Sequence, residues 1–168
     1  MTTNCYDDAM EPKWLSGDEE KAWRGFVALR IGLVGHLARQ LAQECGITEA
    51  EFEVLVVVSE APGQRIRSRE LGKALNWERS RLSHQIARME ERGMVAREQC
   101  ENDARGFDVL LTKAGLKAIQ AAAPKHLEAV RHCFIDLLTP AQMKALANIA
   151  DVVGEHLATE HSQTLTAP

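Results

Sequence analysis

The chain has 168 residues, of which 45% are hydrophobic and 26% are charged, and its formal net charge is −4. These values are ordinary for a soluble globular protein of one domain or two small lobes. No apolar run approaches the roughly 20 residues that span a bilayer, and the polar, acidic residues 1–11 lack the core of a signal peptide, so we expect a cytoplasmic protein without a membrane segment.

The chain is expected to begin with an arm and a long helix. Residues 1–15 show no periodicity, which is typical of a flexible N-terminal arm. Ser16 and Glu19 have the spacing of a capping box, in which each side chain bonds to the other residue's backbone amide. From Trp23 to Leu41 apolar residues recur every three or four positions, which predicts an amphipathic helix that ends near Gly46.

Three shorter helices are predicted in the middle of the chain. Thr48 opens the first with a second capping box, and the Pro-Gly pair at residues 62–63 ends it. Ser68 can cap a brief second helix. A turn at residues 76–77 then leads into the third helix, which ends at Gly93.

The last part of the chain predicts a β-hairpin and further helices. After the third short helix the apolar period changes to about two, which indicates strands at residues 94–100 and 107–111 with a polar, glycine-containing tip between them. Thr112 can cap a helix that Pro124 is expected to bend or interrupt. A third capping box at residues 139–142 begins the final helix.

This order of elements predicts a mainly α fold with a small β-hairpin wing. We expect a winged helix-turn-helix lobe at residues 47–111, long dimerisation helices at 16–46 and 112–159, and a flexible tail at 160–168. Long helices with an apolar stripe must bury it, and a second copy of the chain is the natural cover. Each buried Leu or Phe contributes about 1.5–3 kcal/mol, so ten of them would make a monomer a poor state.

The helix before Gly93 has an unusual exterior. Leu82, Ile86 and Met89 define its inward face, and the remaining surface is mostly basic or hydrogen-bonding: Arg79, Ser80, Arg81, Ser83, His84, Gln85 and Arg88. Cations near a helix N-terminus oppose its dipole, so an external anion such as phosphate would complement them. Residues 64–88 carry a net charge of +5, which leaves −9 for the rest of the chain. A basic island in an acidic protein indicates a localised phosphate-binding face, although a solvated charged surface is the alternative.

A helix-turn-helix with this exterior predicts binding to double-stranded DNA. Its second helix fits the major groove, where Arg can donate two hydrogen bonds to guanine and Ser or His can reach base edges or phosphates. Arg105, at the hairpin tip, is long enough to enter the minor groove. Asp103 can brace Arg105 or the loop amides, or can simply form a turn. The candidate DNA-binding residues are Arg79, Ser80, Arg81, Ser83, His84, Arg88, Arg105 and Asp103.

Four segments in order and spacing resemble the MarR/SlyA family of bacterial transcription regulators: "ELGKAL" (70–75), "ARMEERGMVAR" (87–97), "DAR" (103–105) and "LLTKAG" (110–115). With the flanking helices, the resemblance covers roughly residues 18–158. It implies an obligate homodimer with interlocked terminal helices, in which each protomer presents a winged helix to half of a pseudo-palindromic operator. It places Arg105 at the family's minor-groove arginine, and it favours repression.

The sequence departs from the family pattern at two places. Glu78 replaces the usual Ser or Thr cap of the recognition helix, so Asn76 is expected to cap it instead. The wing carries Gly106, Phe107 and Asp108 where family members are often more basic, which reduces the phosphate affinity that we expect from the wing.

The resemblance also implies a small phenolic or anionic effector between the dimer helices and the winged helix. The candidates to contact it are Trp23, Arg30, His36 and Trp77. The alternatives are that Trp23 lies in the core and that Arg30 lies at the surface or at an interface.

Other kinds of site have weak support. The cysteines, Cys5, Cys45, Cys100 and Cys133, are far apart and are expected to be free thiols, more often buried than redox-active. The histidines do not form a convincing set of zinc ligands, and we expect no metal and no cofactor. No catalytic motif indicates an enzyme. The alternative function is a winged-helix module that binds proteins without specific DNA binding.

Overall fold

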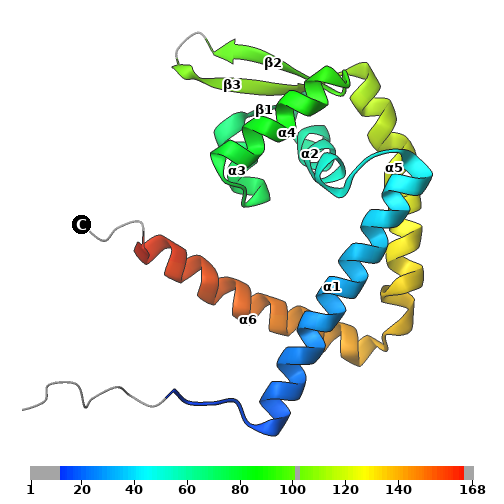
Figure 1. Ribbon diagram of the computed structural model, residues 1–168, viewed down its shortest axis with the longest axis vertical. Helices are drawn as coiled ribbons and strands as arrows, with labels where there is room; N and C mark the ends of the chain where they lie inside the picture. The colour runs from blue at the N-terminus through cyan, green and yellow to red at the C-terminus, as the bar shows by residue number, and fades with distance from the viewer. Residues whose placement is uncertain (1–11, 101–102, 165–168) are drawn as a thin grey trace, which may run out of the picture. The chain divides into compact units, whose positions relative to one another are not determined.

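The computed structural model describes the backbone of residues 12–100 and 103–164 and the side chains of residues 12–99 and 106–160. In chain order the elements are α1 (Gly17–Cys45), α2 (Glu49–Glu60), η1 (Pro62–Gln64), β1 (Arg65–Arg67), α3 (Ser68–Leu75), α4 (Arg79–Glu91), β2 (Val95–Cys100), β3 (Asp103–Leu111), α5 (Lys113–Cys133), η2 (Ile135–Leu137) and α6 (Pro140–Thr164). The predicted fold class, mainly α with a small β wing, is confirmed (Figure 1). The chain divides into two units between Gly35 and His36, so α1 runs through the division.

Most of the predicted helix starts are confirmed by their hydrogen bonds. Glu19 Oε2 accepts the Ser16 amide at 2.7 Å, and this bond lowers the pKa of Glu19. At the start of α2, Glu51 Oε2 accepts the Thr48 amide at 2.8 Å and Thr48 Oγ1 accepts the Glu51 amide at 3.2 Å. The third capping box, at residues 139–142, is present as well. The exceptions are α3, where Ser68 is the first helical residue rather than the cap, and α4; neither helix has a side-chain cap.

The wing belongs to a three-stranded antiparallel sheet with the order β1-β3-β2, rather than to a hairpin alone. Residues 65–67, for which the sequence predicts no element, pair with residues 108–110 of β3. The strand β3 begins at Asp103 rather than at Phe107, so the tip is shorter than predicted. Figure 1 shows β2 and β3 as a ribbon that runs alongside α4 and extends past it.

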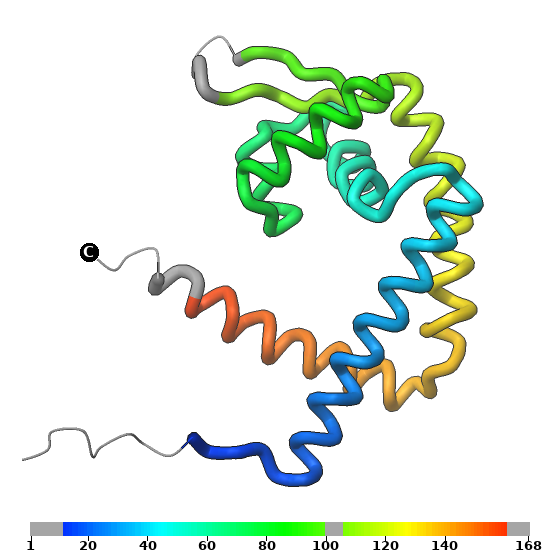
Figure 2. Tube along the Cα trace, in the orientation of Figure 1, coloured from blue at the N-terminus to red at the C-terminus, as the bar shows by residue number. Residues whose placement is uncertain are grey.

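The core of the second unit lies between α2, α3, α4, the sheet and α5. Its largest fully buried side chains come from α2, α3, α4 and the sheet: Val54, Leu55, Val58, Leu71, Ile86, Met89, Val95 and Val109. Figure 2 follows the chain around this core, from α2 through α3 and α4 into β2. Because three apolar residues of α4 belong to the core, the inner face of this helix is fixed and its outer face is left to solvent.

Gly115 allows α5 to start directly against the beginning of the wing. A Cβ at this position would lie 2.0 Å from the Met94 carbonyl oxygen, so only glycine fits. Thr112 Oγ1 caps α5 by accepting the Gly115 amide at 3.0 Å and donates to the Met94 carbonyl. The "LTKAG" segment therefore joins the wing to α5.

Pro124 does not interrupt α5, which continues to Cys133. The proline removes one backbone hydrogen bond, a loss that tertiary packing can offset. Ala122 and Ala129, on either side of the proline, are buried. Burial of these neighbours holds the helix together across Pro124.

Two helices carry rows of exposed apolar residues. On α1 the row includes Trp23, Phe26 and Val34, and Leu29 and Ile31 are exposed on either side of it. On α6 it includes Met143, Leu146, Ile149, Val152, Val153 and Leu157. No helix in the described part of the chain is long and apolar enough to cross a membrane.

His126 makes the stability of the fold depend on pH. Its ring packs on Phe52 with centroids 4.5 Å apart, and its buried Nδ1 has no hydrogen-bond partner among the described residues. This burial lowers the pKa of His126 below its usual 6.5, because the charged ring is desolvated. The neutral ring is therefore favoured by folding, and its contribution to stability is lost as the pH falls from 6.5 through the lowered pKa.

We expect His126→Leu to flatten the acid side of the stability profile. The leucine keeps an apolar contact with Phe52 and cannot be protonated, so the free energy of unfolding should fall less between about pH 7 and pH 5 than in the wild type. Urea unfolding at a series of pH values measures this. His84→Leu, at an exposed position of α4, is the control, and an equal flattening in both variants would contradict the role of His126.

Candidate nucleic-acid interface

The helix α4 presents the exterior that the sequence predicts, with one correction. Leu82, Ile86 and Met89 are buried, and the polar residues that the sequence directs outward lie away from the core: Arg79, Ser80, Arg81, Ser83, His84 and Arg88. The prediction that Gln85 points outward is wrong, because only 4% of its surface is exposed. Its Oε1 accepts a hydrogen bond from Arg88 Nη2, so Gln85 positions this arginine from the side of the helix.

The start of α4 lacks a side-chain cap. Glu78 occupies the N-cap position without a capping hydrogen bond. Asn76 does not cap α4 as expected but ends α3, in a left-handed conformation with φ 51°. Asn adopts this conformation more readily than most residues, which is why it terminates α3 so tightly. With no acidic residue in its first turn, α4 directs uncapped backbone amides and two arginines toward the same end.

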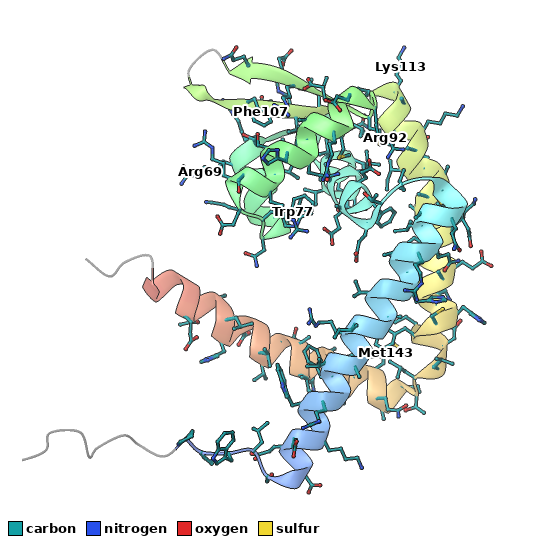
Figure 3. All side chains as sticks on the ribbon, viewed as in Figure 1. Arg69, Trp77, Arg92, Phe107, Lys113 and Met143 are labelled. Atoms are coloured by element: carbon teal, nitrogen blue, oxygen red, sulfur yellow. The ribbon has the colours of Figure 1, made fainter. Side chains whose placement is uncertain are left out.

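Arg81 is held to one side of that end by Trp77. Its guanidinium carbon lies 4.1 Å from the centre of the indole ring, a cation–π contact. Glu53, on the neighbouring α2, is also close enough to respond to Arg81: burial and Glu49 raise the pKa of Glu53, and Arg81 partly offsets them. Figure 3 shows Trp77 at the turn before α4 and Arg92 near the opposite end of the helix.

The wing is anchored to α4 through Arg97. Its Nε lies 3.2 Å from Glu90 Oε2, its Nη2 donates to the Ser83 carbonyl at 3.2 Å, and its guanidinium carbon lies 4.9 Å from the centre of the Phe107 ring. Two of these partners belong to α4 and one to β3, so Arg97 fixes the strands relative to the helix. At the tip, Asp103 and Arg105 are part of strand β3, but their side chains lie outside the part of the chain that the structure describes.

Part of the basic island is neutralised within the sheet. Asp108 is buried, and its two oxygens lie 2.6 Å from Arg65 Nε and 3.2 Å from Arg67 Nε. Arg65 also pairs with Glu98. The hydrogen bond to Asp108 and the charge of Glu98 together raise the pKa of Arg65 above its usual value. The alternation Arg65-Ile66-Arg67 was the only sequence signal for this strand, and it was too short to recognise.

The four candidate effector residues do not share one described pocket. His36 lines an open groove of about 490 Å³ between α1 and α5, together with Arg39, Glu128, His132 and other residues, but without Trp77. Trp77 is half-buried beneath Arg81 instead. Trp23 is 57% exposed, and Arg30 is exposed on the same helix, so Trp23 is not in the core of this chain.

Comparison with known proteins agrees with this geometry. The model of the MarR family matches residues 47–107. The transcriptional regulator HosA of Escherichia coli O127:H6 is 33% identical over 101 residues, which cover 60% of this chain and 73% of HosA.

Two solved structures from Streptomyces coelicolor are similar over most of their length. AbsC, a MarR family transcriptional regulator, is 40% identical with a TM-score of 0.83, and the match covers 88% of this chain and 99% of AbsC. Sco3205, a MarR family regulator solved in complex with DNA, is 41% identical with a TM-score of 0.83, and the match covers 88% of this chain and 92% of Sco3205.

Proposed function

Because the chain belongs to the MarR family of transcriptional regulators, we propose that it binds a specific site on double-stranded DNA as a homodimer and represses transcription there. The observation that carries this proposal is the outer face of α4, where arginine, serine and histidine side chains surround uncapped backbone amides. An α-helix of this kind fits the major groove, and the amides and arginines complement phosphate. Sco3205, which is 41% identical, was solved in complex with DNA, and this supports DNA binding by the present chain.

The surroundings of α4 suggest different roles for its residues. Ser80 and His84 are exposed on the side opposite Leu82, so we assign them to base contacts in the groove. At the flank of the helix, Arg81 makes a cation–π contact with Trp77, and Arg88 donates a hydrogen bond to Gln85. These positions support contacts to the phosphate backbone. We assign Arg79 and Ser83 to the same surface, and Arg105 with Asp103 would complete it at the minor groove.

The exposed apolar rows of α1 and α6 support the homodimer. A soluble monomer rarely exposes so many large apolar side chains along two helices. A second copy could cover both rows and would bring two α4 helices to one duplex, which is the symmetry of a pseudo-palindromic operator. Release by a small phenolic or anionic effector is part of the proposal, with Trp23, Arg30, His36 and Trp77 as candidate contacts.

The decisive experiment is selection of bound duplexes from a random pool. We expect an enriched sequence with two inverted half-sites about one helical turn apart, and an affinity that falls steeply with salt. A flat salt titration with no enriched duplex would instead support a protein-interaction module.

Trp77 offers a test of the role of Arg81. We expect Trp77→Leu to weaken the selected site and random DNA by the same factor, about two- to fivefold, because an exposed cation–π contact contributes about 0.5–1 kcal/mol and a phosphate contact carries no sequence information. Trp77→Phe keeps an aromatic face and should lie between Trp77→Leu and the wild type. Competition binding at fixed salt measures both affinities, and a loss confined to the selected site would assign Arg81 to a base.

A further inference from the structure

The C-terminal end of α1 is bound by cations from two other helices. Gly46 follows α1 with a φ of 66°, and the last turn of the helix has no basic side chain of its own. Instead Lys125 Nζ, from α5, donates to the Glu44 carbonyl at 3.2 Å, and Arg92 Nη2 donates to the Gly46 carbonyl at 2.9 Å. Cations are favoured at the negative end of a helix dipole, so these contacts attach the end of α1 to both neighbours.

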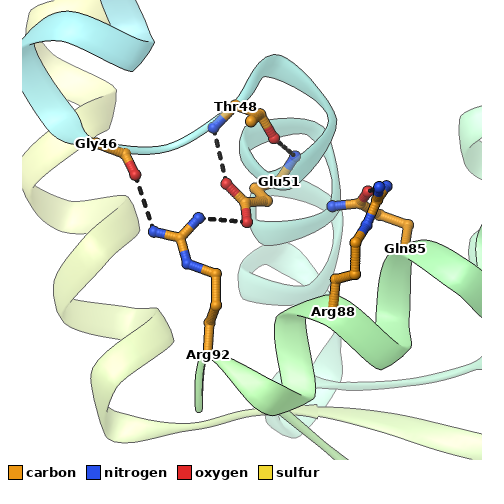
Figure 4. A network of polar contacts seen from close by, with 6 residues as sticks. All are labelled: Gly46, Thr48, Glu51, Gln85, Arg88 and Arg92. Atoms are coloured by element: carbon orange, nitrogen blue, oxygen red, sulfur yellow. Dashed lines mark hydrogen bonds and ion pairs between the residues drawn. The ribbon is translucent and has the colours of Figure 1, made fainter.

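Arg92 also binds the first turn of α2. Its Nη1 lies 2.5 Å from Glu51 Oε1, and the Glu51 side chain is only 5% exposed. The other oxygen of Glu51 is occupied by the amide of Thr48 in the capping box. Figure 4 shows the guanidinium between the Gly46 carbonyl and the Glu51 carboxylate. One planar group thus joins the end of α1 to the start of α2 through two directed hydrogen bonds.

The same residue terminates the recognition helix. Arg92 is the C-cap of α4, and its backbone amide donates to the carbonyls of Arg88 and Glu90. Gly93, with a φ of 67°, then turns the chain into the wing. The position of the last turn of α4 is therefore coupled to the end of α1 by the side chain of the residue whose backbone ends α4.

We propose that Arg92 is a positioning residue that sets the angle between the recognition helix and the end of α1, and thereby the half-site spacing that the dimer accepts. This inference rests on the proposed dimeric DNA binding. In a symmetric dimer the distance between the two recognition helices depends on how firmly each lobe is held to its dimerisation helix. The bonds from Arg92 to Gly46 and Glu51 hold the end of α4 in place, whereas the buried core holds the middle of α4.

The test uses a double variant that removes the link without leaving a buried charge. In Glu51→Gln/Arg92→Gln, the amide introduced at position 51 can keep the capping box with Thr48, and no unpaired carboxylate remains. Arg131→Gln is the matched control, because it removes an ion pair of the same length, 2.5 Å to Asp136, away from this junction. Arg92→Lys retains the charge but lacks the planar fork that holds both acceptors.

The affinity of each protein is measured on duplexes that carry the selected half-sites with the spacer shortened or lengthened by one or two base pairs, at constant salt. One added pair displaces a half-site by about 3.4 Å and about 35° of helical rotation, so the wild type and Arg131→Gln should lose roughly tenfold or more. We expect the double variant to lose less than about threefold over the same series, with affinity for a single half-site unchanged, because only the spacing restraint is relaxed.

Each outcome separates the two proposals. If the double variant folds and its affinity depends on spacer length as in the wild type, the role of Arg92 is overturned, while the proposed DNA binding stands. The same conclusion follows if Arg131→Gln weakens the dependence on spacer length as much as the double variant does. If thermal melting shows that the double variant does not fold, Arg92→Lys decides: a partly flattened series supports the inference and an unchanged series overturns it. A wild-type protein that retains no duplex would refute the proposed function itself.

Discussion

Ile149→Asp/Val153→Asp is expected to dissociate the proposed dimer and to weaken operator binding by about 100-fold or more. Both residues belong to the exposed apolar row of α6, with 62% and 50% of their surfaces accessible in the single chain. A carboxylate at an apolar interface must either lose its hydration or keep the two helices apart. Loss of the second subunit removes the avidity of two half-sites, which is worth about 10² to 10⁴ in affinity.

Lys144→Asp/Asn148→Asp is the matched control, because it also introduces two carboxylates four residues apart on α6, at exposed positions on the face away from Ile149 and Val153. Sedimentation equilibrium should give a monomer for Ile149→Asp/Val153→Asp and a dimer for the control and the wild type. Affinity for a single half-site should be similar in all three proteins. If Ile149→Asp/Val153→Asp remained dimeric, the apolar row of α6 would not be the interface.

His84→Ala is expected to weaken the selected operator by about 5- to 150-fold for each half-site, because a good base contact is worth about 1–3 kcal/mol. His84 is exposed on the outer face of α4, where the imidazole can reach a base edge, and Trp77 and Gln85 hold arginines rather than this histidine. Random DNA should be bound almost as well as by the wild type. This difference between the two duplexes is the signature of direct readout.

His132→Ala controls for the loss of an exposed histidine elsewhere in the chain, since His132 lies in the groove between α1 and α5. Fluorescence anisotropy with labelled operator and unlabelled random competitor gives both affinities. If His84→Ala weakened the two duplexes equally, His84 would be a phosphate contact and base recognition would have to come from Ser80 or the wing.

The sequence was most informative where a local rule determines the structure. The capping boxes at Ser16, Thr48 and Thr139 marked three helix starts correctly, since they depend only on residues three apart. The inward face of α4 was also correct, because three apolar residues at helical spacing define a direction.

Several of the errors concern contacts between residues far apart in the chain. Strand β1 is three residues long and exists because it pairs with residues 108–110 of β3, far along the chain. Gln85 lies three residues after Leu82 and four before Met89, so helical spacing places it beside the inner face, and only its polar side chain suggested that it points outward. The helical conformation around Pro124 persists because Ala122 and Ala129 are packed against other elements.

In the candidate site, too, local features were predictable from the sequence and contacts between distant residues were not. The residue types on α4 were visible in the sequence, but their partners were not. Trp77 beneath Arg81, Gln85 beside Arg88 and Asp108 between two arginines become evident only when the elements are assembled. The contacts of Arg81 with Trp77 and of Arg88 with Gln85 are the reason that we propose phosphate contacts, rather than base contacts, for these two arginines.

The carboxylates that neutralise Arg65, Arg67 and Arg97 have a consequence for how such a regulator would search a genome. Retention on arbitrary sequence grows with the number of phosphates that free cations neutralise. With part of its positive charge satisfied internally, the lobe should leave unrelated DNA quickly, so that fewer copies per cell are needed to keep a genuine operator occupied.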